Sequence, residues 1–172
     1  MPDLYHPEPL SGGDLETWAS LATVLEWLPN VLDAQLTHAC GLTHFEYGIL
    51  YALANAPGHA LRMGVLAGFA NSSLPRLSRA ASRLESRGWL ERSADPQDGR
   101  STLATLTEAG YQQYEGATPG HERLVRRLVL DPLTSAQKRQ LREAARRIIR
   151  AVRTDGEWQS SSAQRPLSAP AR

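Results

Sequence analysis

Four arginines within one short segment have the side-chain chemistry needed to bind a polyanion. They are Arg76, Arg79, Arg83 and Arg87. Their spacing places them on one broad face of an α-helix, with Glu85 as the only carboxylate in the segment. A guanidinium donates two parallel hydrogen bonds to a phosphate or to the edge of a guanine. The face could therefore contact nucleic acid, although an ordinary solvated helix surface carries the same kind of charge.

The net charge of the chain neither supports nor excludes a nucleic-acid partner. It is +1, from 19 Lys and Arg against 18 Asp and Glu, so a basic surface must be local. Residues 71–102 hold six arginines and four carboxylates, which is a small local excess. Lys138 is the only lysine. The preference for arginine fits bidentate contacts with DNA, and it fits a GC-rich coding bias equally well.

The remaining reactive residues form no catalytic or metal-binding motif. The five histidines are scattered, and neither H-E-x-x-H, C-x-x-C, G-x-G-x-x-G nor a P-loop occurs. The segment His44-Phe45-Glu46 has the H-x-E triplet of zinc deaminases, but the P-C-x-x-C that completes that site is absent. We therefore expect no enzyme, no metal and no cofactor.

Cysteine use and hydropathy favour a cytoplasmic protein without a membrane partner. Cys40 is the only cysteine, so the chain can form no internal disulfide. Residues 1–13 lack the basic start and apolar run of a signal peptide, and no stretch approaches 18 apolar residues. Cys40 is expected near a helix C-terminus, where the helix dipole disfavours a thiolate, so we expect it to be inert.

The elements that would position the arginines begin with a long amphipathic helix. Apolar residues recur at helical spacing at Leu15, Trp18, Leu21, Leu25, Leu28, Leu32 and Leu36. This pattern predicts a helix over about residues 14–40, with Asp14 as its N-cap. Pro29 predicts a kink or a break near Asn30.

Three further helices are predicted before the spacing of apolar residues changes from that of a helix to that of a strand. Thr43 and Glu46 form a capping box at the start of the first, which Pro57-Gly58 ends. A short helix over about Leu61–Phe69 and the arginine helix over about Leu74–Arg87 follow. Leu74, Leu77, Ala81 and Leu84 share one apolar face of the arginine helix. Its arginines are therefore expected on the opposite or adjacent side.

The next segments alternate with period two and predict a β-hairpin. Residues 89–92 and 101–106 are strand candidates, and the polar segment 94–100 between them predicts a long loop. Thr107 is expected to cap the following helix. We expect a bend or break in that helix at Gly116, Pro119 and Gly120.

After a break at Asp131-Pro132, the capping box of Thr134 and Gln137 predicts a last helix. Its apolar positions are Leu141, Ala145, Ile148 and Val152. The order of helix, short helix, turn, helix and hairpin is that of a winged helix-turn-helix. In that fold the second helix of the motif fits the major groove of DNA, which is about 12 Å wide. The fold class is therefore mainly α with a small antiparallel β-hairpin.

The hairpin also carries a more specific motif. Asp98-Gly99-Arg100 followed by Leu106-Thr107 reads D-x-R-x-x-x-x-x-L-T. Three other segments accompany it: Gly41-Leu42-Thr43, Arg62-Met63-x-x-Leu66-Ala67, and Ser78-Arg79-x-x-x-Arg83-Leu84-Glu85-x-x-Gly88-Trp89-Leu90-x-Arg92. In these motifs the chain resembles the MarR family of transcription regulators, over about Leu15 to Val152.

The resemblance implies a homodimeric repressor that binds a pseudo-palindromic site in double-stranded DNA. It implies that Asp98 orients Arg100 and that Arg100 enters the minor groove. The other expected DNA-binding residues are Ser73, Arg76, Ser78, Arg79 and Arg83. Many family members release DNA when a small aromatic or anionic effector binds. The candidate lining residues for such a ligand are Trp27, His38, Tyr51 and Arg62, although Trp and Tyr at such positions also fit a core.

The apolar faces of the first and last helices predict the homodimer independently. A core of three helices and a hairpin cannot cover both faces, and a second copy related by twofold symmetry would. The alternative is that these helices fold back on their own domain. A winged helix used only for protein–protein contact is the alternative function.

The expected organisation is one domain flanked by two disordered segments. The disordered segments are residues 1–13 and 154–172, and the winged-helix domain is residues 14–153. Within the domain we expect a DNA-binding core at about 42–107 and dimerisation helices at about 14–40 and 107–153.

Overall fold

The computed structural model describes residues 9–155, and side chains are described up to residue 152. Most of the two segments expected to be disordered, residues 1–8 and 156–172, lies outside the described residues. The described helices are α1 (Gly12–Cys40), α2 (His44–Ala54), α3 (Met63–Phe69), α4 (Leu74–Ser86), α5 (Glu108–Val125) and α6 (Ser135–Asp155), with a 3₁₀ turn η1 (Pro57–His59) and a π-helical turn η2 (Arg126–Leu130). The strands are β1 (Ala60–Arg62), β2 (Leu90–Asp95) and β3 (Asp98–Leu106).

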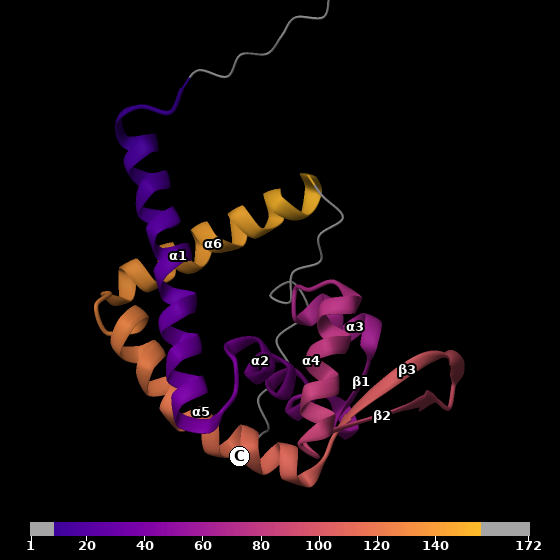
Figure 1. Ribbon diagram of the computed structural model, residues 1–172. Coiled ribbons are helices and arrows are strands. Elements are labelled where there is room, and N and C mark those ends of the chain that lie inside the picture. The colour runs from indigo at the N-terminus through magenta and orange to yellow at the C-terminus, as the bar shows by residue number, and fades with distance from the viewer. Residues whose placement is uncertain (1–8, 156–172) are drawn as a thin grey trace, which may run out of the picture.

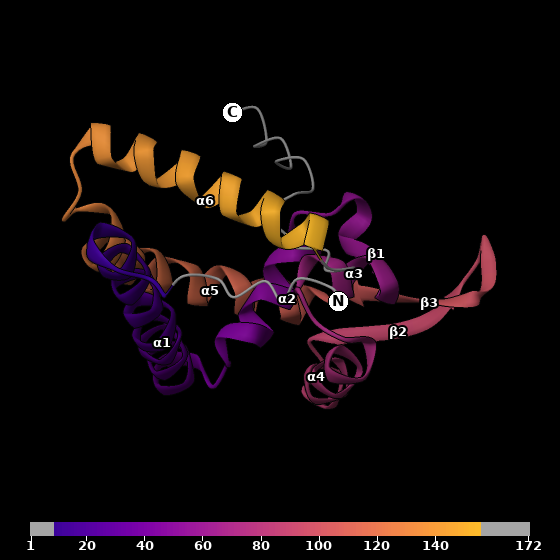
Figure 2. The ribbon, with the colours of Figure 1, turned by 90° about the horizontal axis from the view of Figure 1, so that it is seen from above.

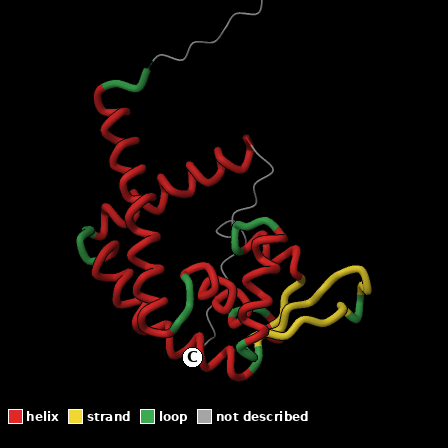
Figure 3. Tube along the Cα trace, viewed as in Figure 1, coloured by secondary structure: helices red, strands yellow, loops and turns green. Residues whose placement is uncertain are grey.

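The three strands form one antiparallel sheet in the order β1-β3-β2, which Figure 3 shows at one side of the helices. Strand β1 was missed, because three residues are too few to show a period. Asp95 pairs with Asp98, so only Pro96 and Gln97 lie between the strands. The prediction of a long loop over residues 94–100 is therefore wrong, since polar residues continue the strands to the hairpin tip. In Figures 1 and 2 this hairpin, the wing, projects beyond the helices.

The core of the winged helix lies between α2, α3, α4 and the base of the sheet. Its fully buried side chains include Ile49, Leu50, Leu53, Leu66, Leu77, Leu84 and Leu90. Leu77 and Leu84 lie on the apolar face predicted for α4, together with Ala81. Leu74 does not, because at the first position of α4 its side chain is 53% exposed.

Helix α1 continues through Pro29, so of the two outcomes predicted near Asn30, a kink or a break, the break is wrong. One proline removes a single N–H donor, and the Asn30 side chain donates to the carbonyl of Glu26 at 2.9 Å in the same turn. The helix begins at Gly12 with Ser11 as N-cap, so Asp14 lies in the first turn rather than at the cap. Only the C-terminal half of α1 is packed on the domain.

Helix α5 is anchored at its start to the end of α4 and the beginning of β2. As predicted, Thr107 caps it, accepting from the Gly110 N–H at 3.0 Å, and the same hydroxyl donates to the Gly88 carbonyl at 2.7 Å. A Cβ on Gly110 would lie 2.0 Å from the Trp89 carbonyl oxygen. Only glycine permits this close approach.

Of the bend or break predicted at Gly116, Pro119 and Gly120, the break does not occur, because α5 runs to Val125 and changes to the π-helical turn η2 at Arg126. Gly120 instead lets α1 approach, since a Cβ there would lie 3.1 Å from the Gln35 amide nitrogen. The capping box of Thr134 and Gln137 before α6 is confirmed. Among the described residues, no helix combines the length and hydropathy needed to cross a membrane.

Candidate nucleic-acid interface

The N-terminus of α4 is exposed and offers unpaired backbone donors. Ser73 is the N-cap, and its side chain makes no capping hydrogen bond. The first N–H groups of a helix point outward and favour an anion, although Pro75 removes one of them. This end of α4 therefore has the local geometry of a phosphate contact.

The first two arginines of α4 are both exposed but differ in their surroundings. The guanidinium of Arg76 lies over the ring of Phe45, 4.5 Å from its centroid. This cation–π contact restrains Arg76 against α2. Arg79 is exposed and has no ion-pair partner within residues 9–152. Arg79 is therefore the α4 arginine most available to a ligand.

The last two arginines of α4 are engaged within the domain. Arg83 donates through Nε to the buried Glu46 at 2.7 Å. Burial alone would raise the pKa of Glu46, but hydrogen bonds from the Thr43 backbone and from Arg83 lower it below its ordinary value. Arg87 donates to the Gly41 carbonyl at 2.6 Å. These two side chains hold α4 against the start of α2.

A further arginine, which the sequence does not identify as structural, connects α4 with the wing. Arg92 on β2 binds Glu85 at 2.6 Å and donates to the hydroxyl of Ser78 at 3.3 Å. Ser78, expected to contact DNA, is thus already a hydrogen-bond acceptor inside the domain. The arginine–carboxylate pair fixes the angle between α4 and β2.

The wing is ordered by two aspartates with different roles. Asp98 accepts from the backbone N–H of Arg100 at 3.2 Å and from the Ser101 hydroxyl at 2.8 Å. It therefore holds the backbone of the turn, whereas the resemblance implied that it orients the Arg100 side chain. Arg100 itself is exposed and has no ion pair in the described part of the chain.

The second aspartate joins the wing to the start of α3. Asp95 is buried and accepts from Arg62 Nε at 2.5 Å and from the Gln97 N–H at 2.8 Å. The Gln97 N–H and the Arg62 guanidinium hold the pKa of Asp95 below its usual value. Arg62, expected to line a ligand site, is thus tied to the wing by this ion pair. Sequence reasoning missed this pair because its partners are 33 residues apart.

A groove of about 570 Å³ separates α4 from the wing. Three arginines line it, Arg62, Arg92 and Arg100, and its lining contains no carboxylate. Of the residues predicted to bind DNA, Ser78 and Arg100 meet in this groove. The others lie outside its lining: Ser73, Arg76, Arg79, Arg83 and Asp98. The groove and the adjoining face of α4 together form a surface that favours an anionic partner.

The four residues proposed to line an effector site are not brought together. Trp27 is 71% exposed on α1, and His38 is exposed in the last turn of that helix. Tyr51 lines a cavity of about 500 Å³ between α2 and the end of α5. Arg62 lies in the groove beside the wing.

Cys40 is partly buried at the end of α1. Its thiol lies 3.1 Å from the Leu36 carbonyl oxygen, and burial raises its pKa. A raised pKa keeps the thiol protonated at neutral pH, which favours the inert role expected from the sequence.

Comparison with known proteins places this geometry among the MarR proteins. The model of the MarR family matches residues 41–101. The structure resembles that of Sco3205, a MarR family transcriptional regulator from Streptomyces coelicolor solved in complex with DNA. The TM-score is 0.82 and the identity 37%, over 86% of this chain and 92% of that one.

Two curated proteins match over shorter segments. The transcriptional regulator YdcH of Bacillus subtilis is 33% identical over 87 residues, which is 48% of this chain and 58% of YdcH. The transcriptional repressor MprA of Escherichia coli is 26% identical over 115 residues, which is 67% of this chain and 65% of MprA. The chain thus spans less than two thirds of the length of either.

Proposed function

Since the chain belongs to the MarR family of transcriptional regulators, we propose that it binds double-stranded DNA in a sequence-specific manner as a homodimer. The observation that carries the proposal is that Arg79 on α4 and Arg100 on the wing are exposed and have no ion pair among the described residues, whereas the other two arginines of the groove are paired with Asp95 and Glu85. A surface of this kind attracts the phosphate backbone. The DNA complex of Sco3205, the 37% identical relative, supports the same assignment.

The two exposed elements would read different features of the DNA. Helix α4 would enter the major groove, with Arg76 and Arg79 near its N-terminus within reach of base edges. Ser73 would bind a phosphate at the exposed helix start. Arg100 on the wing would enter the minor groove, where the negative potential is strong but the sequence code is degenerate. Arg83 would contribute through its charge while it remains bound to Glu46.

The homodimer is supported by apolar surface that the single chain leaves uncovered. On α1, Leu15, Trp18, Leu25 and Trp27 are each about half or more exposed, and on α6 so are Leu141, Ile148 and Val152. Figures 1 and 2 show the N-terminal half of α1 and the whole of α6 standing away from the winged helix. Pairing with a second copy would bury both faces and present two copies of α4 to a palindromic site.

Repression is the regulatory outcome we propose, because a protein bound across a promoter excludes polymerase and MprA is described as a repressor. Release by a small-molecule effector is the expected means of control.

A selection of bound fragments from random duplex DNA tests the proposal. We expect the full chain to enrich an inverted repeat whose half-sites lie about one helical turn apart. Arg79→Ala should weaken binding to that site, whereas Arg139→Ala, which removes the same charge from α6, should leave it unchanged. Failure to enrich any sequence would overturn the proposal and favour the protein-contact alternative.

A further inference from the structure

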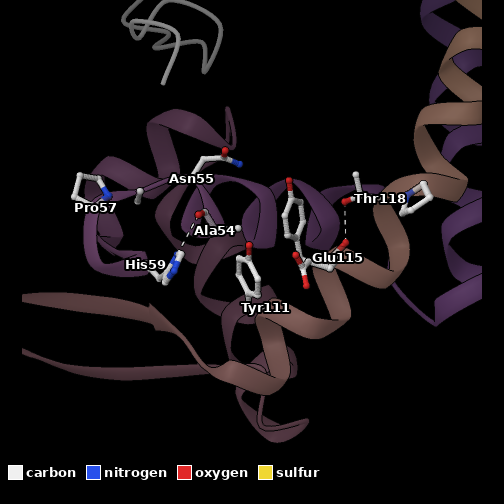
Figure 4. A pocket seen from close by; sticks show the side chains of 10 residues that line it. Ala54, Asn55, Pro57, His59, Tyr111, Glu115 and Thr118 are labelled. Carbon is white, nitrogen blue, oxygen red and sulfur yellow. Dashed lines mark hydrogen bonds between the residues drawn. The ribbon is translucent and has the colours of Figure 1, made fainter. Parts of the chain in front are cut away.

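A further cavity lies between α2 and α5 and shares no lining residue with the arginine groove. It has a volume of about 760 Å³ and is bounded by the C-terminal end of α2, the turn η1 and the first turns of α5 (Figure 4). Cavities of roughly 300–1,000 Å³ hold drug-sized ligands. None of the residues assigned to DNA binding lines it.

One wall of this cavity is aromatic. The ring centroids of His59 and Tyr111 are 5.3 Å apart, and those of Tyr111 and Tyr114 are 6.2 Å apart. The His59 ring is held by a hydrogen bond between Nδ1 and the Ala54 carbonyl oxygen at 3.0 Å. Because a carbonyl only accepts, Nδ1 carries the proton. In the neutral ring Nε2 is therefore an acceptor.

The cavity carries a negative charge and no positive one. Glu115 is the only carboxylate among its lining residues, and no arginine or lysine lines it. The charge of Glu115 acts on the aromatic wall, since it raises the pKa of Tyr111. Figure 4 shows Glu115 and Tyr111 extending from the same helix into this region.

Two polar side chains that line the cavity already donate within the protein. The Asn55 amide donates to the Tyr51 carbonyl at 2.8 Å, and the Thr118 hydroxyl donates to the Tyr114 carbonyl at 2.8 Å. An anionic ligand would therefore find a carboxylate and few free donors. A positively charged ligand would find aromatic faces and the Glu115 carboxylate, which hydrogen-bonds to Tyr111 but faces no arginine or lysine in the lining.

We propose that this cavity binds an organic ammonium cation. Its charged nitrogen would lie against the Tyr111 ring within reach of Glu115, and its apolar part would contact the aromatic wall. The cation–π contact and the attraction to Glu115 both act on the positive charge of the ligand, so the cavity favours cations over anions and uncharged molecules. The neighbouring cavity of about 500 Å³ contains Glu122 and Arg126 together, and charges of both signs give it no such preference.

The position of the cavity gives its occupation a regulatory consequence, which rests on the proposed function. The cavity separates α5 from the turn η1, and η1 leads directly into β1 and α3. A ligand seated there would change how α5 packs on the DNA-binding half. The class of effector then differs from the aromatic or anionic one that the family resemblance implied.

Isothermal titration of the full chain without DNA tests the site directly. The probes are benzyltrimethylammonium, uncharged benzyl alcohol and anionic benzoate, which share one aromatic ring. We expect millimolar or tighter binding of the cation only. Glu115→Gln should weaken the affinity for the cation by about threefold to tenfold, and Tyr111→Leu should do the same. Each substitution removes one of the two attractions, which corresponds to roughly 1 kcal/mol at a partly exposed site. Tyr111→Phe keeps the ring and should bind nearly as well as the wild type.

Glu122→Gln is the matched control, because it removes the same charge from the same helix outside this cavity. Its affinity for the cation should equal that of the wild type. No binding of the cation at millimolar concentration, equal binding of benzoate, or an unchanged affinity in Glu115→Gln would each overturn the proposal. Because the titration contains no DNA, failure to bind DNA would remove the proposed function and leave the ligand site standing.

Discussion

The winged helix and the two long terminal helices bury their apolar side chains to different extents. Between Leu42 and Leu106 the large apolar side chains are mostly buried, and ion pairs tie α4 to α2 and to β2. On α6, by contrast, Leu141, Ile148 and Val152 are each about half exposed. The DNA-binding half therefore covers its own core, whereas α6 and the N-terminal half of α1 leave apolar side chains exposed in the single chain.

This difference separates folding from assembly. A substitution in the winged helix should change the stability of each subunit. A substitution on the exposed face of α6 should change the association of subunits and leave the fold intact. The predictions below test that separation, beginning with the largest expected effect.

The double substitution Leu141→Glu and Ile148→Glu should produce a folded monomer. It places charges on a face that the dimer would bury, and a charge there is costly to bury. Without the second subunit, DNA affinity should fall by about 10² to 10⁴, which is the gain that two linked binding sites provide. Sedimentation equilibrium and gel shift assays measure the two effects.

The control for this double variant is Gln140→Glu, which adds charge at an exposed polar position of the same helix. It should remain dimeric. A double variant that stays dimeric and binds the selected site normally would show that α6 is covered in another way.

Arg100→Ala should weaken DNA binding without affecting assembly. We expect the binding free energy to fall by about 1–3 kcal/mol, by a similar amount for different DNA sequences. An arginine in the minor groove depends more on the electrostatic potential of the groove than on base identity. The slope of log K against log salt should become shallower by roughly 2 per dimer. Salt titrations on the selected site and on scrambled duplex test this. An unchanged salt slope would mean that the wing does not contact DNA.

Glu46→Gln should make the winged helix less stable and less sensitive to acid. Because the folded-state pKa of Glu46 is lowered, its charge stabilises the fold above the unfolded value of 4.5, and this contribution is lost as the pH falls through the folded value. At pH 7 the variant should lose about 1 kcal/mol, since Arg83 is more than half exposed and its attraction is screened. Urea unfolding at several pH values measures the difference in free energy of unfolding between the wild type and the variant. This difference should disappear once the pH is below the folded-state pKa of Glu46. A constant difference at every pH would contradict the assignment.

Cys40→Ser should have the smallest effect of these changes. Burial raises the pKa of the thiol and so disfavours the reactive thiolate. We therefore expect DNA binding to be the same before and after mild peroxide treatment. A wild type that loses DNA binding on oxidation, beside a serine variant that does not, would make Cys40 a sensor.

Features encoded within four residues were predictable from the sequence. The capping boxes at Thr43 and Thr134 and the cap at Thr107 occur as predicted, because each cap depends on side chains and backbone that are neighbours along the chain. The arginine face of α4 follows equally from helical spacing.

Contacts between distant segments were not predictable. Nothing in the sequence shows the ion pairs Arg62–Asp95 and Arg83–Glu46. The cation–π contact between Arg76 and Phe45 is equally hidden. These contacts decide which arginines are free, so the sequence identified the helix that offers the site but not the side chains available on it.

The helix interruptions were predicted too often. Pro29 and Pro119 both lie inside continuous helices, because packing against the rest of the chain outweighs the loss of one hydrogen bond. Gly120 marks the place where α1 approaches α5 rather than a break.

The close approach of Gly110 to the Trp89 carbonyl holds the first turn of α5 against the residue that precedes β2. Thr107 is also bonded to Gly88, so we expect a tilt of α5 to displace α4 and the wing. An 18-residue helix is about 27 Å long, so a tilt of about 5° pivoting at its far end moves the near end by roughly 2 Å. That far end is the π-helical turn η2, beside α6. In a dimer the distance between the two copies of α4 would therefore be set at residues 126–130, far from the DNA.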